Sequence, residues 1–176
     1  MLIESIEEIP GQSNPSDEPN QLPEITKEKF NLSIISADQL AKLEIEPRKP
    51  IIGRWFLEGD LGFIYGPRGL GKTWLGVTMA RHIAEGKELS HWPVNKSRVL
   101  YVDGEMPLEA IQKRDAGLKQ SETPDLLFLN HETFFDAVDR PISLSDPVQQ
   151  KLLADYCQEN DIQVLFLDNL SCLFSG

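Results

Sequence analysis

Short, nearly continuous apolar runs alternate with longer amphipathic stretches along most of the chain. The runs are LGFIY (61–65), RVLYV (98–102), LLFLN (126–130) and QVLFL (163–167). Runs of this length, bounded by Gly, Asp or Pro, predict strands that are buried on both faces. Helices are expected between them at 72–85, 107–119 and 146–160. Strands alternating with helices predict an α/β protein with a parallel sheet flanked by helices.

The stretch 146–160 carries clear signals for a helix start. Asp146 is a good N-cap, Pro147 takes the first helical position, and Gln149 has capping-box spacing. An apolar stripe is expected along this helix at Val148, Leu152, Leu153 and Tyr156.

Residues 1–30 differ in character from the rest of the chain. They hold seven acidic and two basic side chains and four prolines, so we expect a disordered acidic tail. A tether to another domain is the functional alternative. A short helix is expected over 33–44, before Pro47 and Pro50 prevent its continuation.

The composition narrows the class of protein. With 17 Lys and Arg against 28 Asp and Glu, the net charge of −11 argues against a broad basic face that binds nucleic acid. This charge is still compatible with a narrow basic channel. No run approaches the roughly 20 apolar residues of a membrane helix, and the acidic N-terminus is unlike a secretory signal. Two cysteines make no disulfide framework. We therefore expect a cytoplasmic protein with no membrane partner.

Residues 66–73 read GPRGLGKT and fit the phosphate-loop pattern G-x-x-x-x-G-K-[ST] at each fixed position. Glycines let the backbone turn its N–H groups toward a phosphate, and the following helix adds its positive end. Lys72 is expected on the β- and γ-phosphate oxygens, and the Thr73 hydroxyl on Mg²⁺. The expected ATP-binding residues are Gly66, Pro67, Arg68, Gly69, Leu70, Gly71, Lys72 and Thr73. The Arg68 side chain is expected in solvent, with a phosphate or a neighbouring subunit as alternatives.

Two acids are expected at the carboxyl edge of the sheet, where open α/β proteins bind ligands. Asp168 ends the run VLFLD and can hold Mg²⁺ opposite Thr73. Asn169, and no acid, follows it, so the base that orients the attacking water must lie elsewhere. Glu105, just beyond the strand at 98–102, is the candidate. The alternative is that these acids only cap turns or helices.

The segments GPRGLGKTWLG, VDGEM and VLFLDNL resemble the RecA-like P-loop ATPases, and look closest to hexameric replicative helicases of the plasmid RepA type. The resemblance covers about 36–176. It implies Mg²⁺-dependent ATP hydrolysis with Glu105 and Lys72 as catalytic residues, a homohexameric ring, and DNA bound through regions absent from this chain. It also implies that 31–176 is the N-terminal part of a RecA-like domain, incomplete at its C-terminus, because further strands normally follow Asp168.

Other functions stay open on the sequence alone. The chain could be a nucleotide-binding regulatory module, or a truncated remnant without productive turnover. A recombinase or a signalling ATPase would use the same loop. The tryptophans at 55, 74 and 92 are scattered without interleaved basic residues, so we expect core or subunit-contact roles for them rather than stacking on single-stranded nucleic acid.

Overall fold

A computed structural model describes residues 24–119 and 121–174. The chain divides into two compact units, Met1–Glu46 and Pro47–Gly176. The first contains two short helices, α1 (Lys27–Leu32) and α2 (Ala37–Leu40). The final residues of the expected tail are therefore helical, while 1–23 lie outside the described residues. The helix expected over 33–44 shrinks to α2, which begins after a capping box formed by Ser36 and Gln39.

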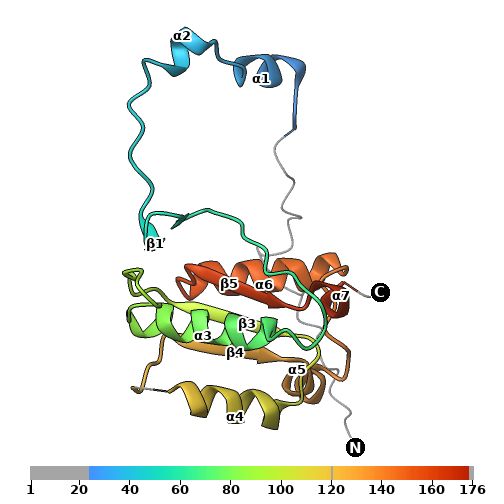
Figure 1. Ribbon diagram of the computed structural model, residues 1–176. Helices are drawn as coiled ribbons and strands as arrows, with labels where there is room; N and C mark the ends of the chain where they lie inside the picture. The colour runs from blue at the N-terminus through green and yellow to red at the C-terminus, as the bar shows by residue number, and fades with distance from the viewer. Residues whose placement is uncertain (1–23, 120, 175–176) are drawn as a thin grey trace, which may run out of the picture. The chain divides into compact units, whose positions relative to one another are not determined.

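The second unit is built on a parallel sheet of three strands in the order β4-β3-β5 (Figure 1). The strands are β3 (Val99–Asp103), β4 (Leu126–Asn130) and β5 (Val164–Asp168). They confirm three of the four expected runs. The strands are in register, so Asp103 lies level with Asn130 on one side and with Asp168 on the other. Three polar side chains thus end neighbouring strands at one edge of the sheet.

The fourth expected strand, LGFIY at 61–65, is a wrong prediction. These residues form no strand in the described part of the chain, and Leu61 and Tyr65 are 83% and 92% exposed. An apolar run becomes a strand only when another strand takes up its backbone hydrogen bonds. None of β3, β4 and β5 pairs with this segment. A small antiparallel pair, β1 (Pro50–Ile52) with β2 (Phe56–Leu57), precedes it and was not predicted.

The helices begin close to where the sequence places them. The helices α3 (Lys72–Glu85) and α4 (Leu108–Leu118) confirm the predictions over 72–85 and 107–119. Two unpredicted helices, α5 (His131–Val138) and α7 (Leu170–Leu173), follow directly on β4 and β5. Asn130 and Asn169 cap them through their side chains. Within 24–119 and 121–174, no helix is long and apolar enough to cross a membrane.

The helix α6 (Pro147–Glu159) confirms the predicted helix, but two of its expected details are wrong. Asp146 does cap it, accepting from the Val148 N–H at 2.9 Å. Gln149 does not close a capping box, because its side-chain oxygen accepts instead from the Ser143 N–H at 2.8 Å. The expected apolar stripe is also mostly exposed, at Val148, Leu152 and Tyr156. The helix packs on the sheet through Leu153 and Cys157.

Side chains of β3 alternate between two hydrophobic cores. Val99 and Tyr101 join α3 residues such as Val77 and Ile83 on one face of the sheet. On the other face, Leu100 and Val102 pack with residues of α5, α6 and α7 and with the segment 142–144. Because side chains alternate along a strand, Asp103 points to the same face as Tyr101. That face is the one covered by α3, the helix that begins at the phosphate loop.

Candidate functional site

The phosphate loop lies at the N-terminus of α3, at the end of the sheet where β3 and β5 finish (Figure 1). Gly71 is the N-cap, with φ at 92°, a left-handed conformation that a residue with a side chain rarely adopts. No side chain of the described chain caps this helix, so its first N–H groups are available to an anion. The Lys72 Nζ donates to the carbonyls of Gly66 at 2.9 Å and Pro67 at 3.1 Å, which holds the ammonium over the loop. The Arg68 side chain is exposed.

Asp168 and the phosphate-loop helix are brought together by Tyr101. The Tyr101 side chain is 1% exposed, and its hydroxyl donates to the Asp168 Oδ2 at 2.7 Å. Burial, followed by the charge of Asp168, raises the pKa of the Tyr101 phenol, so that it remains a donor. The same hydroxyl lies 2.9 Å from where a Cβ would stand on Gly76 of α3, so only glycine lets the helix approach this closely.

This contact places the two groups expected to share a metal on one edge of the sheet. Thr73 lies three residues before Gly76, and residues three apart share one face of a helix. The Thr73 face of α3 therefore points toward Tyr101 and Asp168. One carboxylate and one hydroxyl, supplemented by phosphate oxygens, are the donors that Mg²⁺ takes in nucleotide sites, so this set fits the ion. Described residues form no cluster of three or more His, Cys, Asp or Glu side chains suited to a metal.

Asp103 shapes the turn that carries Glu105. The Asp103 Oδ1 accepts from the backbone N–H groups of Glu105 at 2.9 Å and Met106 at 2.6 Å. Its Oδ2 is buried and has no hydrogen-bond partner among the residues described. Burial raises the pKa of the Asp103 carboxyl, the two backbone hydrogen bonds oppose the rise, and the nearby Asp168 adds to it. The buried Asp103 side chain thus fixes the backbone turn that follows β3.

The Glu105 side chain reaches the end of the neighbouring strand. Its Oε2 accepts from the Asn169 Nδ2, and Asn169 directly follows Asp168. The Gly104 N–H also donates to the Asp168 carbonyl at 2.8 Å. Glu105, Asn169 and Asp168 therefore form one cluster at the sheet edge. A carboxylate held here can accept a proton from a water molecule, provided that the terminal phosphate of a nucleotide lies beside it.

Sequence reasoning missed Tyr101, Gly76 and Asn169, which hold this cluster together. Tyr101 lies in the strand predicted over 98–102 and Asp103 directly follows that strand, so the spacing of two residues was a usable sign that both share a face. Nothing in the sequence pairs Gly76 with Tyr101, because the contact joins a helix and a strand that are 25 positions apart.

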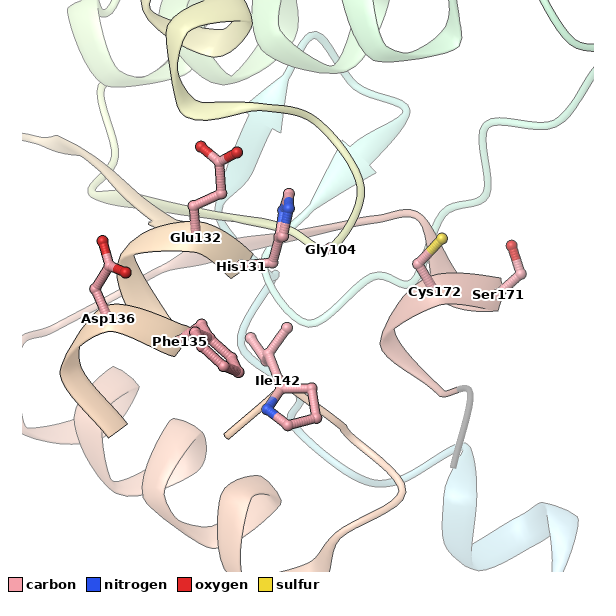
Figure 2. Close-up of a pocket in the computed structure, with 9 residues that line it drawn as sticks. Gly104, His131, Glu132, Phe135, Asp136, Ile142, Ser171 and Cys172 are labelled. Atoms are coloured by element: carbon pink, nitrogen blue, oxygen red, sulfur yellow. The ribbon is translucent and has the colours of Figure 1, made fainter. Parts of the chain in front are cut away.

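A cavity of about 690 Å³ opens along the same carboxyl edge, beside Gly104 (Figure 2). Its lining comes from α5, including His131 and Phe135, from Ile142, and from Ser171 and Cys172 of α7. The His131 Nδ1 is buried and lacks a hydrogen-bond partner within the described chain. None of these residues was predicted to be functional, and most of them lie in α5 and α7, two helices that the sequence pattern did not reveal.

The three-stranded parallel sheet, the flanking helices and the glycine loop leading into α3 define an α/β protein of the P-loop nucleotide-binding class. The family described as AAA domain matches residues 26–176, and the chain belongs to this family. It is therefore a nucleotide-binding ATPase of the P-loop type. No curated protein and no solved structure gives a significant match to the chain.

Proposed function

We propose that this chain binds Mg²⁺-ATP at the loop 66–73 and carries the hydrolytic groups of a RecA-like motor. The observation that carries the proposal is the bridge from Gly76 through Tyr101 to Asp168, which joins the phosphate-loop helix to an acid at a strand end. The backbone N–H groups of the loop and Lys72 bind the phosphates. Thr73 and Asp168 hold the ion.

Magnesium, when bound, neutralises phosphate charge and favours attack on the terminal phosphorus. Glu105 accepts a hydrogen bond from the attacking water and orients it. Asn169 keeps the Glu105 carboxylate at the sheet edge, as its hydrogen bond to Oε2 supports. Asp103 stabilises the turn that carries Glu105, because its carboxylate accepts hydrogen bonds from two backbone N–H groups of that turn.

Calorimetric titration of the full chain with ATP, in the presence and absence of Mg²⁺, tests the binding step. Lys72→Ala should abolish ATP binding, because it removes the ammonium that lies over the loop. Lys113→Ala is the matched control, since Lys113 is an exposed lysine of α4 paired only with the exposed Glu109 in the interactions described. ATP binding by Lys72→Ala with the affinity of the original chain would rule out this site.

Phosphate release tests the hydrolytic step. Glu105→Gln should keep ATP affinity and lose turnover, because the amide cannot take the proton of water. Glu109→Gln, which changes an exposed glutamate of the next helix, should keep both. Equal turnover by Glu105→Gln and the original chain would remove Glu105 from the mechanism.

The resemblance to RepA-type helicases supports a proposal for the process that ATP hydrolysis drives. We propose a DNA-dependent motor that assembles as a homohexameric ring and acts in replication. Stimulation of phosphate release by single-stranded DNA, together with a hexamer mass in native mass spectrometry with ATP, is the expected result. A recombinase-like or signalling ATPase would instead show hydrolysis without DNA unwinding.

One observation favours a second candidate, a nucleotide-binding module without productive turnover. The segment 61–65, which leads into the loop, is not part of the sheet, and Phe63 and Tyr65 are exposed. A loop with one flank outside the sheet is held less firmly, and catalysis requires more precise positioning of its groups than binding does. Saturable ATP binding with no phosphate release, both with and without DNA, would support this candidate.

A further inference from the structure

Trp74 is a large aromatic side chain left exposed beside the phosphate loop. It directly follows Thr73 in the first turn of α3, and 46% of it is accessible to solvent. Of the two expected roles, a place in the core is therefore wrong for this tryptophan, and a subunit contact stays a prediction. Other residues of the same helix, such as Val77 and Ala80, are fully buried and supply its packing on the sheet.

A guanidinium group lies over the Trp74 ring. The Arg114 Cζ is 5.3 Å from the ring centroid, which is within the range of a cation–π interaction. Arg114 belongs to α4, and its Nη1 also donates to the sulfur of Met106. Met106 is the residue after Glu105. Arg114 thus connects the first turn of α3 with the turn that carries Glu105, and the proposed phosphate and metal contacts leave it without a role.

The geometry of α3 sets the side of the site on which Trp74 lies. Thr73 shares a face with Gly76, and that face points to Tyr101 and Asp168. Successive residues of an α-helix are turned by about 100°, so the Trp74 side chain leaves the axis in another direction, toward α4. A triphosphate whose terminal phosphate and metal face Asp168 must direct its nucleoside away from Asp168. Trp74 lies on the α4 side of the helix, away from the face that points to Asp168.

We propose that Trp74 and Arg114 form the nucleoside-binding side of the triphosphate site. One face of the indole stacks on the base, and the Arg114 guanidinium covers the other face and adds positive charge next to the phosphate chain. Base–aromatic stacking is tolerant of base identity, so the pair accepts nucleoside triphosphates with little selectivity between adenine and guanine. This inference rests on the proposed phosphate site.

Comparing the affinity for a nucleotide with the affinity for a bare triphosphate separates the proposed nucleoside contacts from the proposed phosphate site. The full chain is titrated calorimetrically with Mg²⁺-ATP, Mg²⁺-GTP and magnesium tripolyphosphate, which has the phosphates but no nucleoside. The original chain should bind both nucleotides about tenfold more tightly than tripolyphosphate. Trp74→Leu keeps apolar volume but removes the aromatic face, so it should lose this advantage and leave tripolyphosphate affinity unchanged. Arg114→Gln should also reduce the affinity for both nucleotides.

Two further variants make the outcomes distinct. Trp55→Leu is the matched control, because Trp55 is similarly exposed at 49% but makes an edge-to-face contact with Trp92 instead of a contact with Arg114. Trp74→Phe should restore most of the nucleotide affinity, and far-UV circular dichroism establishes that each variant is folded. Unchanged ATP affinity in Trp74→Leu, or equal losses for ATP and tripolyphosphate, would overturn the inference while leaving the phosphate site standing. Failure of the original chain to bind either ligand would instead refute the phosphate site, and the inference with it.

Discussion

Substituting Gly76 by alanine places a methyl group against the hydroxyl of Tyr101. The added Cβ would stand 2.9 Å from that oxygen, closer than non-bonded atoms tolerate. Tyr101 cannot swing away freely, since its ring is 1% exposed and stacks on Phe166 with centroids 5.6 Å apart. The strain therefore falls on the hydrogen bond from Tyr101 to Asp168.

The expected cost follows from three contributions. Overpacking of a filled core costs about 1–3 kcal/mol. A weakened hydrogen bond to the Asp168 carboxylate adds about 1 kcal/mol, at the low end because Asp168 is partly exposed. Alanine returns about 1 kcal/mol, because it is a better helix former than glycine. Gly76→Ala should thus lower the free energy of unfolding by about 2 kcal/mol, and Tyr101→Phe by about 1.5 kcal/mol.

The double variant gives the sharper test. Without the hydroxyl, the nearest ring atoms of residue 101 lie 3.5 and 3.6 Å from the new methyl, which is ordinary van der Waals contact. In a Tyr101→Phe background, Gly76→Ala should therefore stabilise the chain by about 0.5–1 kcal/mol through helix propensity. Urea unfolding followed by far-UV circular dichroism measures all four corners of the cycle. Additive effects of the two substitutions would refute the contact between α3 and Tyr101 as described.

Two further predictions concern charged side chains away from the loop. Arg81 is 5% exposed and pairs with Asp115. Arg81→Met should lower the free energy of unfolding by about 3 kcal/mol in the same urea assay, because it removes the cation that pairs with the partly buried Asp115 carboxylate. A change below about 0.5 kcal/mol would contradict this prediction. The backbone N–H of Leu57 and then the side chain of Arg48 lower the pKa of Asp60 below 3.8. A depressed carboxyl pKa stabilises the folded state above pH 3.8 and loses that contribution as the pH falls through the folded-state value. Asp60→Asn should flatten the loss of thermal stability in that acidic window, and an unchanged acid profile would count against the interaction.

Much of the sheet was predictable because the relevant signals are local. Buried parallel strands are nearly continuous apolar runs, and β3, β4 and β5 have that pattern. The start of α3 at Lys72 follows from the glycines before it and the amphipathic stretch after it. Asp168 was expected at a strand end because the apolar run stops there, and β5 ends at that residue.

The failures have physical causes in the same chain. The run 61–65 has the composition of a buried strand, but pairing depends on a neighbouring strand that composition does not specify. The helix α5 went unrecognised because it starts at His131, directly after the strand, and is only eight residues long. The exposed stripe of α6 shows that apolar periodicity reveals a possible face, while docking decides which side chains are buried.

The phosphate loop, the acid at 168 and the glutamate at 105 can be read from the amino-acid order alone, because the residue types and spacings that bind phosphate are local and few. Only the tertiary structure decided that Tyr101 joins Gly76 to Asp168, that Asn169 holds Glu105, and that Arg114 lies over Trp74. These contacts join residues that are distant along the chain, and they exist because a particular helix packs on a particular face of the sheet at one depth.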